Sequence, residues 1–310
     1  NGWLMDEEIA AKAKAAGVNT IAISLDGLKK THDYIRKEGS FDRIMNSIDI
    51  IINAGVYCSI ITTINNININ ELEELHSILT KKRVSGWQIQ LGLPMGNMAH
   101  NSDLVSTPEH IDRVIEFAYK ASKSSDVEIQ LADCIGYFNH KEIEVRKIQS
   151  GLEDYSWFGC GAGKLNFGIL HNGDIVGCTS IRSKDFIEGN IRETSIVDIW
   201  NNKNLFAWNR NLTKDKLKGL CSKCINGSTC LGGCANTRLT MEGSVYGENR
   251  YCSYNYAVKK AEEQLNRVSD ANTLLEKARK FINNKSYQLA GIVLENLIDQ
   301  QNDNCEALSH

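Results

Sequence analysis

The residues most able to carry chemistry are seven cysteines in the second half of the chain. Their order and spacing are Cys160-x12-Gly173-x4-Cys178, then Cys221-x2-Cys224-x5-Cys230-x3-Cys234, then x17 to Cys252. The rest of the 310 residues contain only Cys58, Cys134 and Cys305. A disulfide scaffold is typically small and secreted, with cysteines throughout. A dense block after a long cysteine-poor stretch instead favours metal ligation in a reducing cytosol.

The spacing within this block is that of ligands to more than one metal centre. Two thiolates separated by two residues reach one centre from a single turn, whereas longer gaps bring ligands from separate loops. Seven thiolates exceed the four that one site needs, so we predict two sites, one of them a ligand short. From spacing alone, structural zinc and iron–sulfur clusters are equally supported. Glycines beside the ligands let backbone N–H groups approach bound sulfur: Gly159, Gly161, Gly163, Gly232 and Gly233.

The elements that must position these cysteines begin with alternating helices and strands over the first 135 residues. Short β-branched runs predict strands at 20–25, 56–64, 85–93 and 127–132. The run at 20–25 is almost continuously apolar, which predicts a strand buried on both faces. Amphipathic stretches predict helices from the N-cap Asp6 to Ala16 and over 41–53, 71–82 and 108–122. This order predicts right-handed crossovers and a parallel sheet or partial barrel.

Two features of the N-terminus lead us to expect further sequence upstream. The chain opens with a predicted helix rather than a strand, and its first residue is Asn1 rather than Met. A complete eight-fold barrel also needs more than these 135 residues. We expect two to three βα units, roughly 70–100 residues in all, before Asn1.

Beyond about Trp157 the pattern changes to Gly- and Cys-rich loops. Asn172-Gly173 between the apolar runs 165–170 and 174–178 predicts a hairpin. Helical periodicity returns from about Tyr254. The positions of Ala278, Tyr287, Ala290 and Leu294 resemble one tetratricopeptide-type helix pair followed by the start of a second repeat. A plain amphipathic tail that packs on the preceding domain is the alternative.

Composition and charge exclude several classes of function. The chain has 35 basic and 38 acidic side chains, a net charge of −3, and so lacks the basic footprint of a nucleic-acid or anionic-membrane binder. Its 42% hydrophobic and 24% charged residues are typical of a globular protein. No apolar run approaches the ~18–20 residues of a membrane span, and the N-terminus lacks the order of a signal peptide. We expect a cytoplasmic protein without nucleic-acid or membrane partners.

The seven-cysteine string, including Gly173, resembles the SPASM domain of radical S-adenosylmethionine (radical SAM) enzymes. The segments FIEGNIRETSIVDIW (186–200) and LGGC (231–234) resemble the same domain. Upstream, the ISLDG of 23–27, followed by His32-Asp33 and Arg36, is similar to the fourth strand of the radical SAM barrel and the loop after it. The resemblance implies an α/β chain with three parts: a partial (β/α)6-type barrel over 1–140, a SPASM iron–sulfur domain over 155–258 and a helical, tetratricopeptide-like tail over 259–310.

The resemblance also implies two auxiliary [4Fe-4S] clusters. In the family pattern one cluster takes the first, second and sixth cysteines, here Cys160, Cys178 and Cys234. The other takes the remaining four: Cys221, Cys224, Cys230 and Cys252. Some members have an eighth cysteine between the first two, but residues 161–177 contain none. We therefore expect an open iron or a non-cysteine ligand at the first cluster. A substrate thiolate is the favoured occupant, with water or the spare thiol of Cys134 as alternatives.

The same resemblance implies binding of S-adenosylmethionine. Ser24 and Arg36 are candidates for its methionyl carboxylate, because a guanidinium pairs with a carboxylate as a planar fork and Ser supplies a neutral donor. Alternatively, Ser24 merely ends a strand and Arg36 lies on a solvated turn. Thr63, Asn65 and Gln90 are polar residues at predicted strand ends, expected on the same rim. The family's Cys-x3-Cys-x2-Cys triad does not occur in the 310 residues. We expect it, with a third [4Fe-4S] cluster, before Asn1, and we expect no radical initiation without it.

The implied function is a radical SAM/SPASM maturase that modifies a ribosomally made peptide or a protein through a 5′-deoxyadenosyl radical, with crosslinking as the favoured outcome. A sulfatase-maturating enzyme is the first alternative. That subgroup usually has an Asp after the second cysteine, whereas Thr179 follows Cys178. A non-catalytic, metal-stabilised binding module whose repeat-like tail recruits a protein partner is the second alternative.

Overall fold

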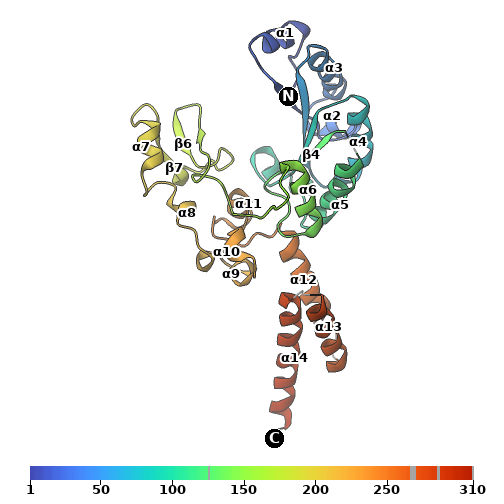
Figure 1. Cartoon of the computed structure of the whole chain (residues 1–310), viewed down its shortest axis with the longest axis vertical. Coiled ribbons are helices and arrows are strands. Elements are labelled where there is room, and N and C mark those ends of the chain that lie inside the picture. Colours follow the sequence, from blue (N-terminus) through green and yellow to red (C-terminus); the bar gives the residue numbers. More distant parts are fainter. Residues whose placement is uncertain (125, 266–269, 285–286, 309–310) are drawn as a thin grey trace.

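The first half of the protein is built on a four-stranded parallel sheet. The computed structural model describes residues 1–124, 126–265, 270–284 and 287–308 (Figure 1). The strands follow one another across the sheet: β1 (Thr20–Ser24), β2 (Tyr57–Ile64), β3 (Gly86–Leu91) and β4 (Glu128–Leu131). Each strand pairs in parallel with the next. The predicted α/β class with a parallel sheet is confirmed, and all four predicted strands form, each within its expected range.

Helices connect these strands, as the sequence pattern predicts. They are α1 (Glu7–Ala15), α2 (Lys29–Ile35), α3 (Ser40–Asn53), α4 (Leu72–Lys81), α5 (Glu109–Ser124) and α6 (His140–Ser150), with short 3-10 turns η1 (Ile69–Glu71), η2 (Gly96–His100) and η3 (Ser102–Leu104). The predicted N-cap Asp6 is correct, since its Oδ1 accepts the N–H of Ile9 at 2.8 Å. Helices α2 and α6 were not predicted.

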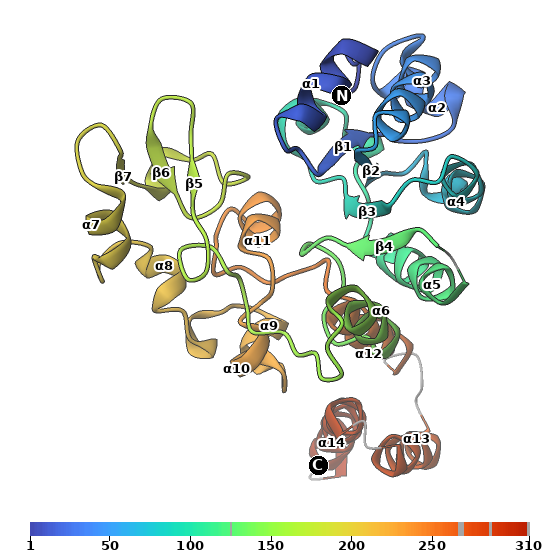
Figure 2. The same ribbon diagram turned by 45° about the horizontal axis from the view of Figure 1, so that its top comes forward.

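The core lies between the sheet and the helices on one of its faces. Along β2, burial alternates: Cys58, Ile60, Thr62 and Ile64 are fully buried, and the side chains between them are only partly buried. The apolar members of the buried set pack in the core with α3, α4 and α5. Figure 2 shows these helices on one side of the sheet and the Cys-rich region on the other. The expectation that 20–25 is buried on both faces is wrong, because Ala22 is exposed. Its face of the sheet borders an open groove of about 490 Å³.

The Cys-rich region is mostly loops and short helices. The predicted hairpin forms from β5 (Gly168–Ile169) and β6 (Asp174–Val176), and β7 (Ile187–Asn190) adds a third antiparallel strand. The other elements are η4 (Lys184–Phe186), α7 (Ile196–Asn201), α8 (Ala207–Arg210), η5 (Lys214–Lys216), α9 (Leu220–Lys223), α10 (Gly227–Cys230) and α11 (Ala235–Glu242). Figure 2 places α11 on the side of this region nearest the sheet.

The C-terminal part is helical, as predicted. Helix α12 (Ser253–Leu265) leads to α13 (Ala271–Asn283) and α14 (Tyr287–Leu308), which extend away from the rest of the molecule (Figure 1). A small core of its own joins α13 to α14: Leu274, Ala278, Val293 and Leu297. The tetratricopeptide character stays a prediction, and residues 266–269, 285–286 and 309–310 of that tail lie outside the described residues. No helix in the described part of the chain is long and apolar enough to cross a membrane.

Candidate functional site

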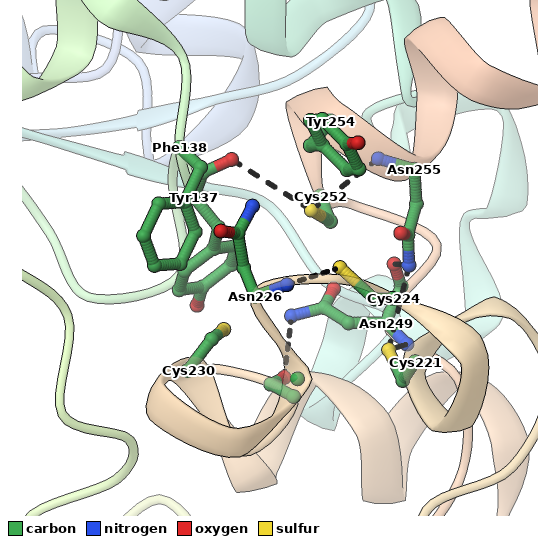
Figure 3. A pocket seen from close by; sticks show the side chains of 12 residues that line it. Tyr137, Phe138, Cys221, Cys224, Asn226, Cys230, Asn249, Cys252, Tyr254 and Asn255 are labelled. Atoms are coloured by element: carbon green, nitrogen blue, oxygen red, sulfur yellow. Dashed lines mark hydrogen bonds between the residues drawn. The ribbon is translucent and has the colours of Figure 1, made fainter. Parts of the chain in front are cut away.

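Four of the seven clustered cysteines surround one cavity. Cys221 lies on α9, Cys230 ends α10, and Cys224 and Cys252 lie in the loops beside α9 and α12. All four line the same cavity, which Figure 3 shows from close by. They are the four that the family resemblance assigns to one cluster. In the described ranges, no three His, Cys, Asp or Glu side chains are placed to bind a single metal ion. The four thiols therefore surround a space wider than one ion.

Two of the predicted glycines, Gly232 and Gly233, direct backbone N–H groups at Cys230, and asparagines supply further N–H groups to the other sulfurs. The backbone N–H groups of Asn226 and Asn249 donate to the Sγ atoms of Cys224 and Cys221, each at 3.4 Å. Asn255 donates its backbone N–H to Cys252 at 3.5 Å and its side-chain amide to Cys221 at 3.4 Å (Figure 3). Such bonds stabilise thiolates and tune clusters. The only sequence signal was position, since Asn226 and Asn255 lie two and three residues after a cysteine.

Burial favours the protonated form of three of these thiols, because it raises the pKa values of Cys224, Cys230 and Cys252. It raises the pKa of Cys230 to about 12 and that of Cys252 well above its ordinary value. At neutral pH such side chains become ligands only when a positive centre displaces their protons. The chemistry of the donor set therefore fits a bound metal centre.

The other three clustered cysteines lie around a second, larger cavity. Cys160, Cys178 and Cys234 line a space of about 460 Å³ between the Cys-rich region and the ends of β3 and β4. Its other walls include Gln90 at the end of β3 and Cys134 just after β4. In open parallel sheets, ligands bind beyond the carboxyl ends of the strands. The two sets of cysteines assigned by resemblance thus line two different cavities.

A fully buried guanidinium lies close to both sets of cysteines. Arg238 on α11 is 0% exposed, and its three nitrogen atoms have no hydrogen-bond partner. Burial lowers its pKa, and the thiols of Cys221 and Cys160 are near enough to raise it. A buried cation without a partner is costly unless negative charge lies beside it. Thiolate-ligated iron–sulfur clusters carry such charge, so this orphaned side chain is a second sign that the site fits them.

A third cavity holds two of the residues predicted to bind S-adenosylmethionine. Ser24 and Arg36 both line a space of about 260 Å³ beside β1 and α3. Arg36 Nε donates to Oδ2 of the buried Asp26 at 2.5 Å. The same carboxylate accepts the backbone N–H of Thr63 through Oδ1 at 2.8 Å. Asp26 thus orients Arg36 and ties the end of β1 to β2.

His32 lines the same cavity and was missed by the sequence analysis. It is 0% exposed, and its Nδ1 accepts the backbone N–H of Asp26 at 2.9 Å. Burial lowers the pKa of His32, so the ring is neutral at pH 7 and Nε2 carries the proton. That buried Nε2 has no partner. The cavity therefore presents a hydroxyl, a guanidinium and an unused N–H donor, a set suited to a carboxylate.

The remaining three predicted rim residues do not line this cavity, although the backbone N–H of Thr63 shares the Asp26 carboxylate with Arg36. Gln90 lines the cavity of Cys160 and donates from Nε2 to Thr63 Oγ1 at 3.0 Å. Asn65 is buried, and its Oδ1 accepts the backbone N–H groups of Ile67 and Asn68, so its side chain shapes a turn. The structure brings Ser24 and Arg36 together and does not bring Thr63, Asn65 or Gln90 into their cavity.

Two separate segments of the chain match known protein families. Residues 1–79 match the family model of the radical SAM superfamily, and residues 160–225 match SPASM, an iron–sulfur cluster-binding domain. An AdoMet-dependent heme synthase of Oleidesulfovibrio alaskensis is 27% identical over 85% of this chain and 69% of its own length. The mycofactocin maturase MftC of Mycolicibacterium smegmatis is 26% identical over 76% of this chain and 57% of its own. These relatives are enzymes.

Solved structures share the fold. The enzyme anSMEcpe with bound AdoMet and the Cp18Cys peptide superimposes with a TM-score of 0.62 at 18% identity, over 85% of this chain and 73% of its own. Streptococcus suis SuiB bound to its precursor peptide SuiA gives a TM-score of 0.55 at 18% identity, over 78% of this chain and 54% of its own. The matched domains imply iron–sulfur clusters and S-adenosylmethionine. This chain therefore carries a radical SAM domain and a SPASM iron–sulfur cluster-binding domain.

Proposed function

We propose that this chain binds two auxiliary [4Fe-4S] clusters and presents a peptide or protein to radical chemistry. The observation that carries the proposal is the separation of seven thiols into two cavities, one of them at the carboxyl end of the parallel sheet. The orphaned guanidinium of Arg238 beside both cavities supports anionic occupants. When bound, S-adenosylmethionine and the clusters supply hydrogen abstraction and electron transfer.

The residues around the third cavity support binding of S-adenosylmethionine at its carboxylate. Arg36, oriented by Asp26, presents its remaining N–H groups as a fork. Ser24 supplies a hydroxyl, and His32 supplies an Nε2 proton that has no partner among the described residues. The role of this chain is to hold the amino-acid end of the cofactor at the end of β1.

A peptide is favoured over an iron tetrapyrrole as the substrate. The relatives include heme synthases, so both classes need consideration. Among the described residues that line the cavity of Cys160, none is Lys, Arg or His, whereas several propionate carboxylates would need cations. Amide and aromatic side chains line it instead, and Phe158 and Leu165 are largely exposed. Such a surface suits an apolar or cysteine-containing peptide.

Metal analysis after anaerobic reconstitution of the 310-residue chain tests the cluster assignment. We expect about eight iron and eight sulfide per chain, as two four-iron clusters require. Cys224→Ala removes one cluster and leaves the other, because its thiol lines only the first cavity. Cys58→Ala, which changes a core residue of β2, keeps both. A colourless protein with stoichiometric zinc would contradict the proposal.

Substrate class is tested by binding to the reconstituted chain. We expect Fe-coproporphyrin III to give no saturable change in its Soret band, because the cavity offers no cation to its carboxylates. For a protein that combines this chain with a Cys-x3-Cys-x2-Cys segment, supplied with S-adenosylmethionine and reductant, mass spectrometry of a synthetic pool of cysteine-containing peptides is expected to show loss of a hydrogen pair. Tight stoichiometric porphyrin binding, with no change in any peptide, would show that the substrate is a tetrapyrrole rather than a peptide.

A further inference from the structure

The cavity of Cys160, Cys178 and Cys234 contains a fourth thiol. Cys134 lies on the loop that follows β4, and it lines the same cavity from the side of the sheet. We propose that Cys134 is the fourth thiolate of the cluster in this cavity, so that the sheet domain and the SPASM domain share one metal centre. The inference rests on the proposed function only in assuming that a cluster binds there.

The turn that carries Cys134 is held rigidly from within the sheet domain. Ile135 N–H donates to the carbonyl of Ala132 at 3.0 Å, which closes the turn. Arg146 of α6 is 3% exposed and donates to the carbonyls of Leu131 and Ala132 at 3.0 Å and of Ile135 at 2.8 Å. Three bonds from one buried side chain fix the backbone on both sides of Cys134. The thiol is thereby preorganised, as a metal ligand must be.

The same turn is joined directly to the loop of Cys234. The hydroxyl of Tyr137 donates to the carbonyl of Asp133 and accepts the backbone N–H of Cys234 at 2.9 Å. The tyrosine ring also packs against Gly233, where an added Cβ would lie 2.3 Å from Cζ. One side chain therefore links the residue before Cys134 to the backbone of Cys234, and it holds the two walls of the cavity together.

Cys134 also differs from a cysteine that only fills a core. Its Sγ accepts the backbone N–H of Leu91 at 3.4 Å, the type and length of bond found at Cys221 and Cys224. Cys58, by contrast, is 0% exposed within the hydrophobic core of the sheet. A thiol that faces a cavity with three other thiols and receives an N–H bond has the surroundings of a ligand.

The chemistry of ligation requires no redox partner. Iron of the cluster replaces the thiol proton of Cys134, and that proton leaves to solvent. With four protein thiolates, every iron of this cluster is closed to outside ligands. A substrate thiolate then has no vacant iron to bind, and the cluster is limited to electron transfer.

Electron paramagnetic resonance of the reduced clusters tests this ligation. We reconstitute the wild-type chain, Cys134→Ala and the matched control Cys58→Ala, and first verify iron and sulfide. Adding β-mercaptoethanol is expected to leave the spectra of wild type and Cys58→Ala unchanged and to shift the signal of one cluster in Cys134→Ala. A shift in wild type, or no shift in any of the three, overturns the inference while leaving the proposed clusters in place.

Alkylation of the wild-type protein provides a readout that does not depend on a folded variant. Native chain with and without clusters is treated with excess iodoacetamide at about pH 9.5, because burial raises the pKa of the Cys134 thiol to about 12 and only the thiolate reacts. Peptide mapping then locates the label. We expect Cys134 to be labelled in the apoprotein and protected in the loaded protein, together with Cys160 and Cys234. Equal labelling of Cys134 in both states, with Cys160 protected, shows that Cys134 is not a ligand. Failure of the proposed function would appear differently: the protein would not take up the expected iron during reconstitution.

Discussion

Arg238 is a fully buried cation that lies close to both sets of cysteines. It lies at 0% exposure on α11 with three unpaired nitrogen atoms, and it packs against Gly232, where an added Cβ would lie 3.0 Å from Nη1. Removing a cation beside an anionic cluster makes the gain of a further electron less favourable. With the proposed clusters bound, a residue that is not a ligand would therefore set part of their potential.

We predict that Arg238→Met lowers the reduction potential of the nearby clusters. The expected change is roughly 60 mV or more, which equals a tenfold change in a one-electron equilibrium. Arg238→Lys retains the charge and keeps most of the wild-type value. A redox titration followed by electron paramagnetic resonance measures the change. An unaltered potential in a fully loaded Arg238→Met protein would show that the guanidinium balances no cluster charge.

His32 makes the stability of the protein sensitive to acid. Burial lowers the pKa of His32 below 6.5, so the unfolded chain binds a proton more readily than the folded one. Its contribution is complete above the unfolded pKa and is lost as the pH falls from there through the folded pKa. Protonation would also cost the bond that Nδ1 accepts from Asp26 N–H.

We therefore predict that the free energy of unfolding declines as the pH falls below about 6.5. His32→Asn should flatten this decline, since an amide oxygen replaces the acceptor but binds no proton. His76 and His110, whose pKa values burial also lowers, leave a residual slope. Urea unfolding of the apoprotein between about pH 8 and pH 5 measures it. Identical slopes in wild type and His32→Asn would contradict the assignment.

For single residues, the sequence reveals those with a recognisable local motif. It does not reveal those whose importance depends on where the fold buries them. The cysteines, Ser24 and Arg36 carry local signatures. Arg238 and His32 do not, because their importance comes from complete burial without a partner. Asn65 was predicted as a site residue from its position at a strand end, but its side chain accepts two hydrogen bonds from the turn that follows it.

Among the elements, the loop between β4 and α6 matters most to the site. Tyr137 and Phe138 have φ values of +84° and +59°, a conformation that costs about 1–3 kcal/mol for each side-chain-bearing residue. Both line the cavity of Cys221, and Tyr137 also reaches Cys234 N. Such strain persists because contacts on both sides determine the backbone. The loop therefore contributes to both cysteine cavities, as the segment 230–234 also does.

We predict that Tyr137→Phe weakens the junction between the sheet and the Cys-rich region. The change leaves the carbonyl of Asp133 and the N–H of Cys234 without their partner, at a cost of about 1–3 kcal/mol. Tyr34→Phe, at a 72% exposed position on α2, is the control. Urea unfolding of reconstituted protein measures the difference. Equal midpoints for the two variants would show that the hydroxyl contributes nothing.

Helix α2 shows why some elements could not be predicted. Its N-terminus is capped from another part of the chain: Glu71 accepts the N–H of Leu28 at 2.8 Å and the hydroxyl of Thr31 at 2.5 Å. A seven-residue helix without a local cap leaves little signal. The strands and longer helices were predictable because the periodicity of their apolar residues reflects the core they face.

In the molecule as a whole, the helical tail forms a separate structural unit. Helices α13 and α14 extend from α12 and pack around Leu274, Ala278, Val293 and Leu297 (Figure 1). We predict that Leu274→Ala destabilises this pair by about 2–5 kcal/mol and leaves iron content unchanged. Ile282→Ala, at a 44% exposed position of α13, is the matched control. Hydrogen exchange resolved by segment measures both, and loss of iron in Leu274→Ala would show that the tail supports the cavities.

The pairing of Gly136 with Cys252 has a consequence for biosynthesis. This parallel bridge, reinforced by Ser253 N–H donating to Gly136 O at 2.9 Å, closes the cavity shared by Cys221, Cys224 and Cys230. The thiol of Cys252 and the Tyr137 carbonyl beside it are 115 positions apart in the chain. During translation, the loop of Tyr137 is made long before Cys252, whereas the other three cysteines precede Cys252 by only 22 to 31 residues. A cluster held by all four thiols, as proposed, would therefore be completed only after synthesis has passed residue 252, and a chain stalled earlier would leave its thiols open to oxidation.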